Sequence, residues 1–147
     1  MINAKPSSFV LLIVVIPLIV YFFFVQWQPT TIYGDDLIVY MKHSGLHGFA
    51  EKMSLPTTMG KYRPVHGLVL NVLIAAFQKN LAGYFLFNIG IQVLNTFLFA
   101  MVVNLFVSSA FYSLFISLTV GLSRFALYNV TQLFYGGPME GVAMSFF

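Results

Sequence analysis

The chain has 147 residues, of which 59% are hydrophobic and only 7% charged, and its mean hydropathy is +0.88. So few polar groups cannot cover a water-soluble domain, and the composition predicts an integral membrane protein. The net charge is +3, and the seven Lys and Arg form no dense cluster, which excludes a nucleic-acid-binding surface. The chain has no cysteine, which excludes disulfides, thiolate metal sites and a cysteine nucleophile.

The first apolar run covers residues 9–25 and holds no charge. At about 1.5 Å per residue, a helix of this length crosses most of the apolar core of a bilayer. A cleaved signal peptide is the alternative, but no small-residue cleavage pattern follows. Trp27 and Pro29 come next instead, which suits an interfacial anchor and a helix stop. We therefore expect a retained transmembrane helix, kinked at Pro17.

Residues 26–63 form a long loop of turn formers, polar groups and both charge signs. Within it, Asp35 to His47 is predicted to be a short helix with an aspartate near its N-terminus, where the helix dipole favours an acid. Loops of this length are more often functional than simple connections.

The next two elements are both apolar but differ in length. Residues 64–78 begin with a proline and are too short to span, so we expect an interfacial helix. Residues 81–107 form a charge-free span in which Asn88, Gln92 and Asn95 share one helical face. These amides either bond to other helices or line a substrate cavity.

A third span is predicted over residues 110–130, containing Arg124, and a further helix starts at 138–147. The fold class is therefore an all-α polytopic membrane protein, one domain with three to four transmembrane helices. Lys5 beside the first span favours a cytoplasmic N-terminus and an extracytoplasmic first loop. The opposite argument is that most basic residues lie in that loop and the helix after it.

Several short motifs occur in a recognisable order: Tyr33-Gly34-Asp35-Asp36, Lys61-Tyr62-Arg63-Pro64-Val65, Gly83-Tyr84-Phe85-Leu86-Phe87-Asn88 and Gln92-Val93-Leu94-Asn95. This order resembles the N-terminal part of GT-C superfamily membrane glycosyltransferases, especially those similar to protein O-mannosyltransferases and related bacterial polytopic sugar transferases. Val65 replaces the usual leucine and Phe87 the usual histidine.

The resemblance implies an active site in the first loop, on the extracytoplasmic face of a bacterial inner membrane or the endoplasmic reticulum. It implies transfer of a sugar from a polyprenyl-phosphate donor to an acceptor. Enzymes of this superfamily have more transmembrane helices than the three or four predicted here, so this chain is expected to be an N-terminal portion of such an enzyme. Its expected partners are membrane lipids, the lipid-linked donor, and the remainder of the enzyme or another membrane subunit. No Gly-rich phosphate loop points to a nucleotide-sugar donor.

Asp35 and Asp36 are the candidate catalytic residues. Transfer needs a base for the acceptor hydroxyl, and Asp35 is expected to supply it. Asp36 is expected to orient the loop, pair with a basic group or help Asp35 hold a divalent metal ion, the candidate cofactor.

The candidate donor-phosphate ligands are Arg63, Lys61 and Arg124. The alternative for these cations is contact with bulk headgroups or snorkelling. The candidate substrate-cavity residues are Tyr62, His66, Asn88 and Gln92. The alternative function is a small non-enzymatic membrane protein that scaffolds a partner subunit, with the amide face as the contact.

Overall fold

The computed structural model describes residues 6–32, 34–44, 64–107 and 109–134, and these residues form helices and no strand. The predicted all-α class is therefore confirmed for the described part of the chain. The helices are α1 (Pro6–Val25), α2 (Gly34–Ser44), α4 (Pro64–Phe77), α5 (Leu81–Val107), α6 (Ala110–Gly121) and α7 (Arg124–Thr131).

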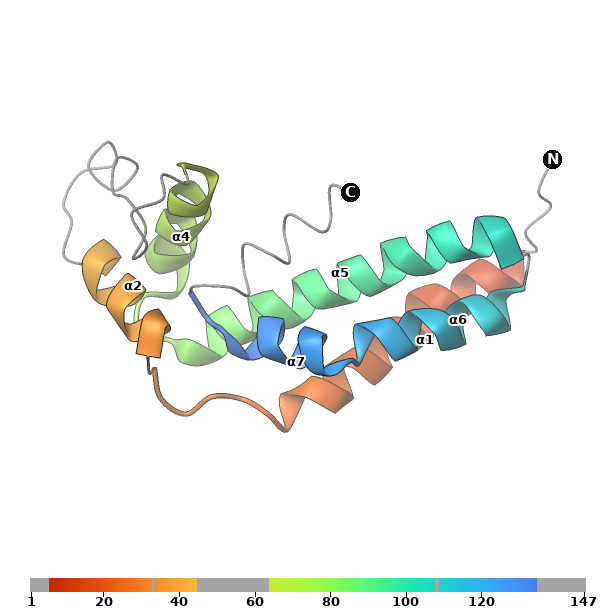
Figure 1. The fold of residues 1–147 in the computed structure, drawn as a ribbon, viewed down its shortest axis with the longest axis horizontal. Helices are drawn as coiled ribbons and strands as arrows, with labels where there is room; N and C mark the ends of the chain where they lie inside the picture. Colours follow the sequence, from red (N-terminus) through yellow and green to blue (C-terminus); the bar gives the residue numbers. More distant parts are fainter. Residues whose placement is uncertain (1–5, 33, 45–63, 108, 135–147) are drawn as a thin grey trace.

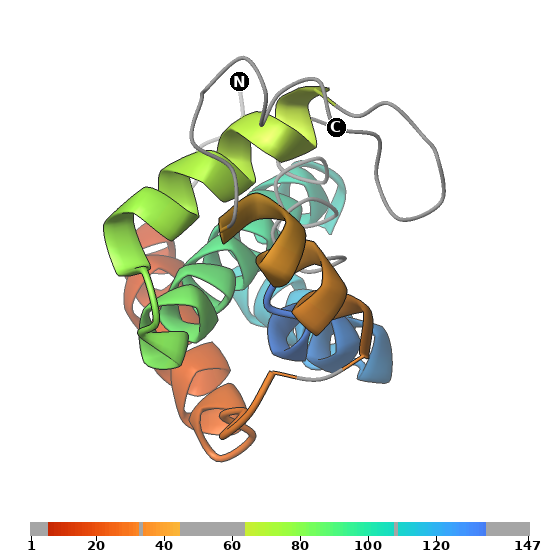
Figure 2. The ribbon, with the colours of Figure 1, turned by 90° about the vertical axis from the view of Figure 1, so that its left-hand side faces the viewer.

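The long helix α5 is the centre of the molecule and contacts α1, α4, α6 and α7. Helices α1, α5 and α6 lie alongside one another, and α7 continues beyond α6 (Figure 1). Helices α2 and α4 lie across one end of this bundle, where they contact each other (Figure 2). Helices α2 and α4 are thus both placed at a single end of the bundle.

Helix α1 buries one stripe of side chains spaced four residues apart: Leu12, Ile16, Val20 and Phe24. This spacing follows one face of a helix, so the stripe packs on the bundle while the other faces stay exposed. The helix ends where expected, because Trp27 N–H donates to the Phe24 carbonyl in a tight turn.

A tight corner joins α4 to α5. Gln78 has a left-handed φ of 49°, and its N–H donates to the Ile74 carbonyl at 2.9 Å, a common way to end a helix. The Tyr84 hydroxyl donates to the Gln78 carbonyl at 2.7 Å. Helices are therefore observed over the ranges predicted as 64–78 and 81–107, while the interfacial place of the first and the membrane crossing of the second stay predictions.

The expected third span is not continuous. Helix α6 ends at Gly121, Ser123 caps α7 by accepting from Ala126 N–H, and the two helices are bent by 57°. Gly121 and Ser123, two residues apart, form a stop-and-start pattern, which the apolar run around them concealed. The range predicted as a third span, 110–130, thus holds two helices joined at a bend, and its crossing of a membrane stays a prediction.

The break at Gly121 depends on close packing against α5. A Cβ at this position would overlap the Thr96 side chain, with Cγ2 at 2.7 Å, whereas a Cβ at Gly90 would meet nothing within 4 Å. Gly121→Ala should therefore lower the free energy of unfolding by about 1–3 kcal/mol. Gly90→Ala is the matched control and should leave it unchanged or raise it by up to about 1 kcal/mol. Unfolding in mixed micelles measures both, and equal effects would contradict the packing argument.

By length and composition, one described helix could cross a membrane, namely α5. The bent pair α6 and α7 passes the same test when the two are taken together. Leu12–Val25 and Gly67–Phe77 are shorter apolar helical stretches.

Candidate functional site

Asp36 lies in the first turn of α2, next to the chain that follows α7. Its side chain is only 7% exposed. Leu133 N–H donates to Oδ2 at 2.7 Å and Phe134 N–H donates to Oδ1 at 2.9 Å. The first turn of α2 is thus bonded to the chain just beyond α7. Such hydrogen bonds to an ionised acceptor are stronger than neutral ones.

The same stretch, which we call the exit segment (residues 130–134), is also held by α5. Asn88 Nδ2 donates to the carbonyls of Val130 at 3.3 Å and Gln132 at 3.0 Å. These carbonyls lie at the C-terminal end of α7, where a helix lacks its own donors. Asn88 therefore supplies a donor that the helix end needs.

Aromatic rings complete this contact. The Phe134 ring is fully buried, with its centroid 4.6 Å from that of Tyr84 and 5.2 Å from that of Tyr40. Tyr40 comes from α2 and Tyr84 from α5, so Phe134 joins both helices. Tilted ring pairs at such distances are favourable beyond the area they bury.

Asp35 lies in the first turn of α2, beside the anchored Asp36. The structure describes only the backbone of Asp35 and His66, while Lys61, Tyr62 and Arg63 lie outside the described residues. The roles expected for these five residues stay predictions.

Asn88, Gln92 and Asn95 are all buried, as expected for amides on one helical face. Gln92 Nε2 donates to the Gly121 carbonyl at 3.0 Å, which satisfies an acceptor at the break between α6 and α7. Asn88 and Gln92 thus make bonds between helices, the first of the two alternatives, and their role in a cavity stays a prediction. A scaffold would need another contact surface, since both amides bond within the chain.

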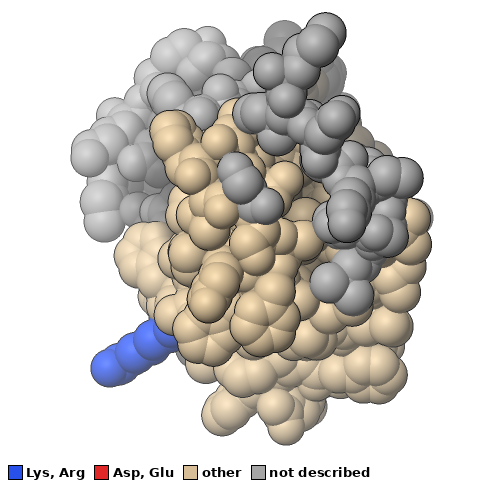
Figure 3. Space-filling model, turned by 90° about the vertical axis from the view of Figure 1, so that its right-hand side faces the viewer, with Lys and Arg blue, Asp and Glu red and all other residues tan. Residues whose placement is uncertain are grey.

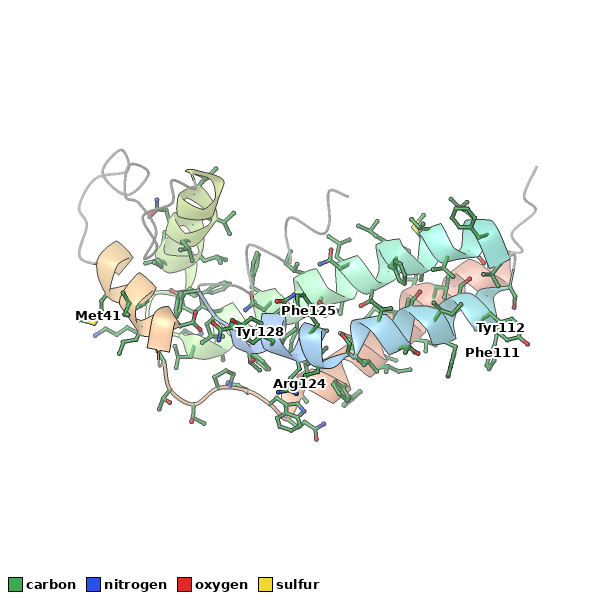
Figure 4. The ribbon with its side chains drawn as sticks, in the orientation of Figure 1. Met41, Phe111, Tyr112, Arg124, Phe125 and Tyr128 are labelled. Atoms are coloured by element: carbon green, nitrogen blue, oxygen red, sulfur yellow. The ribbon has the colours of Figure 1, made fainter. Side chains whose placement is uncertain are left out.

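Arg124 begins α7 and is exposed at the lower edge of the view in Figure 4, and Phe125 and Tyr128 on the same helix are exposed as well. Because Gln92 bonds to Gly121 and Asn88 to Val130, Arg124 lies level with the part of α5 between these amides. It forms no ion pair with any residue in the described ranges. An arginine at this level of an apolar bundle can attract an anionic group.

The chemistry available at the α2 end is that of carboxylates beside an apolar bundle. No group of three or more acidic or histidine side chains lies together in the part of the chain that the structure describes. The divalent metal ion expected at Asp35 and Asp36 therefore stays a prediction.

Sequence reasoning did not identify Tyr40 or Phe134, nor the backbone N–H groups that bind Asp36. The residues of α2 are far in the chain from the groups that they contact, with Asp36 and Phe134 separated by 98 residues. Only the repeated presence of aromatic residues next to the motifs could have suggested them.

The chain was compared with protein-family models, curated proteins and solved structures, and none of them matches.

Proposed function

We propose that the chain is a membrane protein in which α1, α5 and the α6–α7 pair cross the bilayer, with α2 and α4 at one surface. The support is an apolar exterior together with polar side chains in the interior. Large apolar side chains are exposed along these helices, including Val10, Phe22, Leu105, Phe106, Phe111 and Phe115. Polar side chains are buried between them, including Asn88, Gln92, Asn95, Thr96, Ser113, Ser117 and Asn129.

This pattern is typical of membrane helices, because lipid accepts an apolar exterior while amides and hydroxyls bond between helices. A soluble monomer rarely exposes so much continuous apolar surface. The described surface facing the viewer at the end opposite α2 is mostly uncharged (Figure 3).

We further propose that this membrane protein is the N-terminal portion of a glycosyltransferase that takes a sugar from a polyprenyl-phosphate donor. The observation that carries the proposal is the place of the Asp35-Asp36 pair: α2 lies across the end of an apolar bundle and is fixed there through Asp36. A carboxylate at such a boundary is within reach of a water-soluble acceptor and of a lipid headgroup.

The roles follow from the residue types. Asp35 takes the proton of the acceptor hydroxyl. Arg63 and Lys61 bind the donor phosphate. Arg124, exposed at the start of α7, is a third cation for the lipid phosphate.

The donor class provides the test. Membranes carrying the protein are supplied with a radiolabelled polyprenyl-phosphate sugar or with the corresponding nucleotide sugar, and membranes lacking the protein serve as the control. We expect protein-dependent transfer from the lipid-linked donor only. Transfer from the nucleotide sugar alone, or no transfer from any lipid-linked sugar, would reject the proposal.

A further inference from the structure

We infer that Asp36 is a positioning residue: its carboxylate ties α2 to the exit segment and so sets where Asp35 lies, while proton transfer falls to Asp35 alone. This inference rests on the proposed function and selects one of the roles that the sequence left open for Asp36, with the main-chain groups through which it acts.

The geometry shows how the Asp36 carboxylate is used. Each of its oxygens accepts a backbone N–H, from Leu133 at 2.7 Å and from Phe134 at 2.9 Å. Both bonds are buried. A base has to present a free lone pair to a substrate hydroxyl, whereas these oxygens are oriented toward the main chain of another helix end.

The two donors also explain why an acid is needed here. Two N–H groups require two acceptors, and an ionised carboxylate offers one on each oxygen. An asparagine offers a single oxygen and turns an NH₂ group toward the second N–H. One buried backbone donor would then be left without a partner, which is costly.

The contacts of Asp36 and Tyr40 with the exit segment, which we call the anchor, hold α2 at two points on one face. Asp36 and Tyr40 are four residues apart, so they share a helical face, and both contact the exit segment, Tyr40 through the Phe134 ring. The exit segment is in turn bonded to α5 by Asn88. Helix α2 is therefore fixed in rotation relative to α5.

Fixing the rotation of α2 also fixes the position of Asp35. Successive residues are turned by about 100° around a helix, so Asp35 occupies a different face from the anchored one. Loss of the anchor would let α2 rotate or shift, and a misplacement of about 1 Å can cost about 10²-fold in rate.

The decisive experiment is the pH dependence of transfer from a polyprenyl-phosphate sugar by the membrane-embedded protein. Asp36→Asn should lower kcat by about 10²-fold, leave KM for the donor within about twofold, and keep the acid limb of the pH–rate profile. Asp35→Asn should remove that limb. Loss of the limb in Asp36→Asn would make Asp36 the base, and wild-type kcat in that variant would remove its positioning role; either result overturns the inference.

A second variant covers the case in which Asp36→Asn does not fold. Phe134→Leu loosens the same contact without touching either carboxylate. It should also lower kcat while keeping KM and the acid limb. An unchanged kcat in Phe134→Leu would overturn the inference.

Amide hydrogen exchange separates failure of the anchor from failure of the proposed enzyme activity. In the intact protein the peptide containing Leu133 and Phe134 should be protected, and Asp36→Asn should speed its exchange by at least about tenfold. If no variant transfers sugar but exchange responds in this way, the proposed function fails and the anchor stands. Unchanged exchange in Asp36→Asn means that the carboxylate does not hold the segment, and the inference is then wrong.

Discussion

Phe134→Ala is expected to lower the free energy of unfolding by about 3–5 kcal/mol, the usual cost of removing a fully buried phenyl ring. The Phe134 side chain has 0% exposure and contacts the rings of Tyr40 and Tyr84. The cavity would open where α2, α5 and the exit segment meet. The backbone N–H of residue 134, which donates to Asp36 Oδ1, would then be held less rigidly because the ring no longer packs beside it.

The matched control is Phe125→Ala, the same substitution on α7 at a ring that is 66% exposed. It should change stability by no more than about 0.5 kcal/mol, as expected for a surface position. Titration with a denaturing detergent in mixed micelles gives both free energies. Equal losses for the two variants would show that Phe134 is not part of a packed centre.

Asp35→Asn is expected to reduce the rate of sugar transfer by about 10²–10⁴-fold, the contribution of a positioned general base. The free energy of unfolding should fall by no more than about 1 kcal/mol, because the substitution removes only the interaction of the charge with the N-terminal end of the helix dipole. The measurement is single-turnover transfer from a polyprenyl-phosphate sugar, with donor binding followed separately. Binding should be unchanged, since the carboxylate acts on the acceptor.

Glu51→Gln serves as the control, because it is also an acid-to-amide change in the first loop and no role in transfer is assigned to it. It should transfer at the wild-type rate. Transfer by Asp35→Asn at the rate of Glu51→Gln would remove Asp35 from the mechanism.

The helices themselves could be predicted from local patterns. Charge-free apolar runs bounded by Pro29, Pro64 and the Gln78-Lys79-Asn80 turn gave boundaries within a few residues of those observed for α1, α4 and α5. Hydrophobic runs predict helices well because the pattern can be read from neighbouring residues without knowledge of the tertiary contacts. The break before Arg124 was missed for the same reason, since Gly121 and Ser123 are weak interruptions in an otherwise apolar run.

The sequence by itself determined the class of elements, the shared face of the three amides on α5 and the candidate role of the Asp35-Asp36 pair. Only the tertiary structure decided that Asp36 binds the main chain at Leu133 and Phe134, and that Asn88 and Gln92 bond to the ends of α7 and α6. These partners are backbone groups, which every residue carries alike. No side-chain pattern marks which of them will be left without a helical partner until the helices have packed.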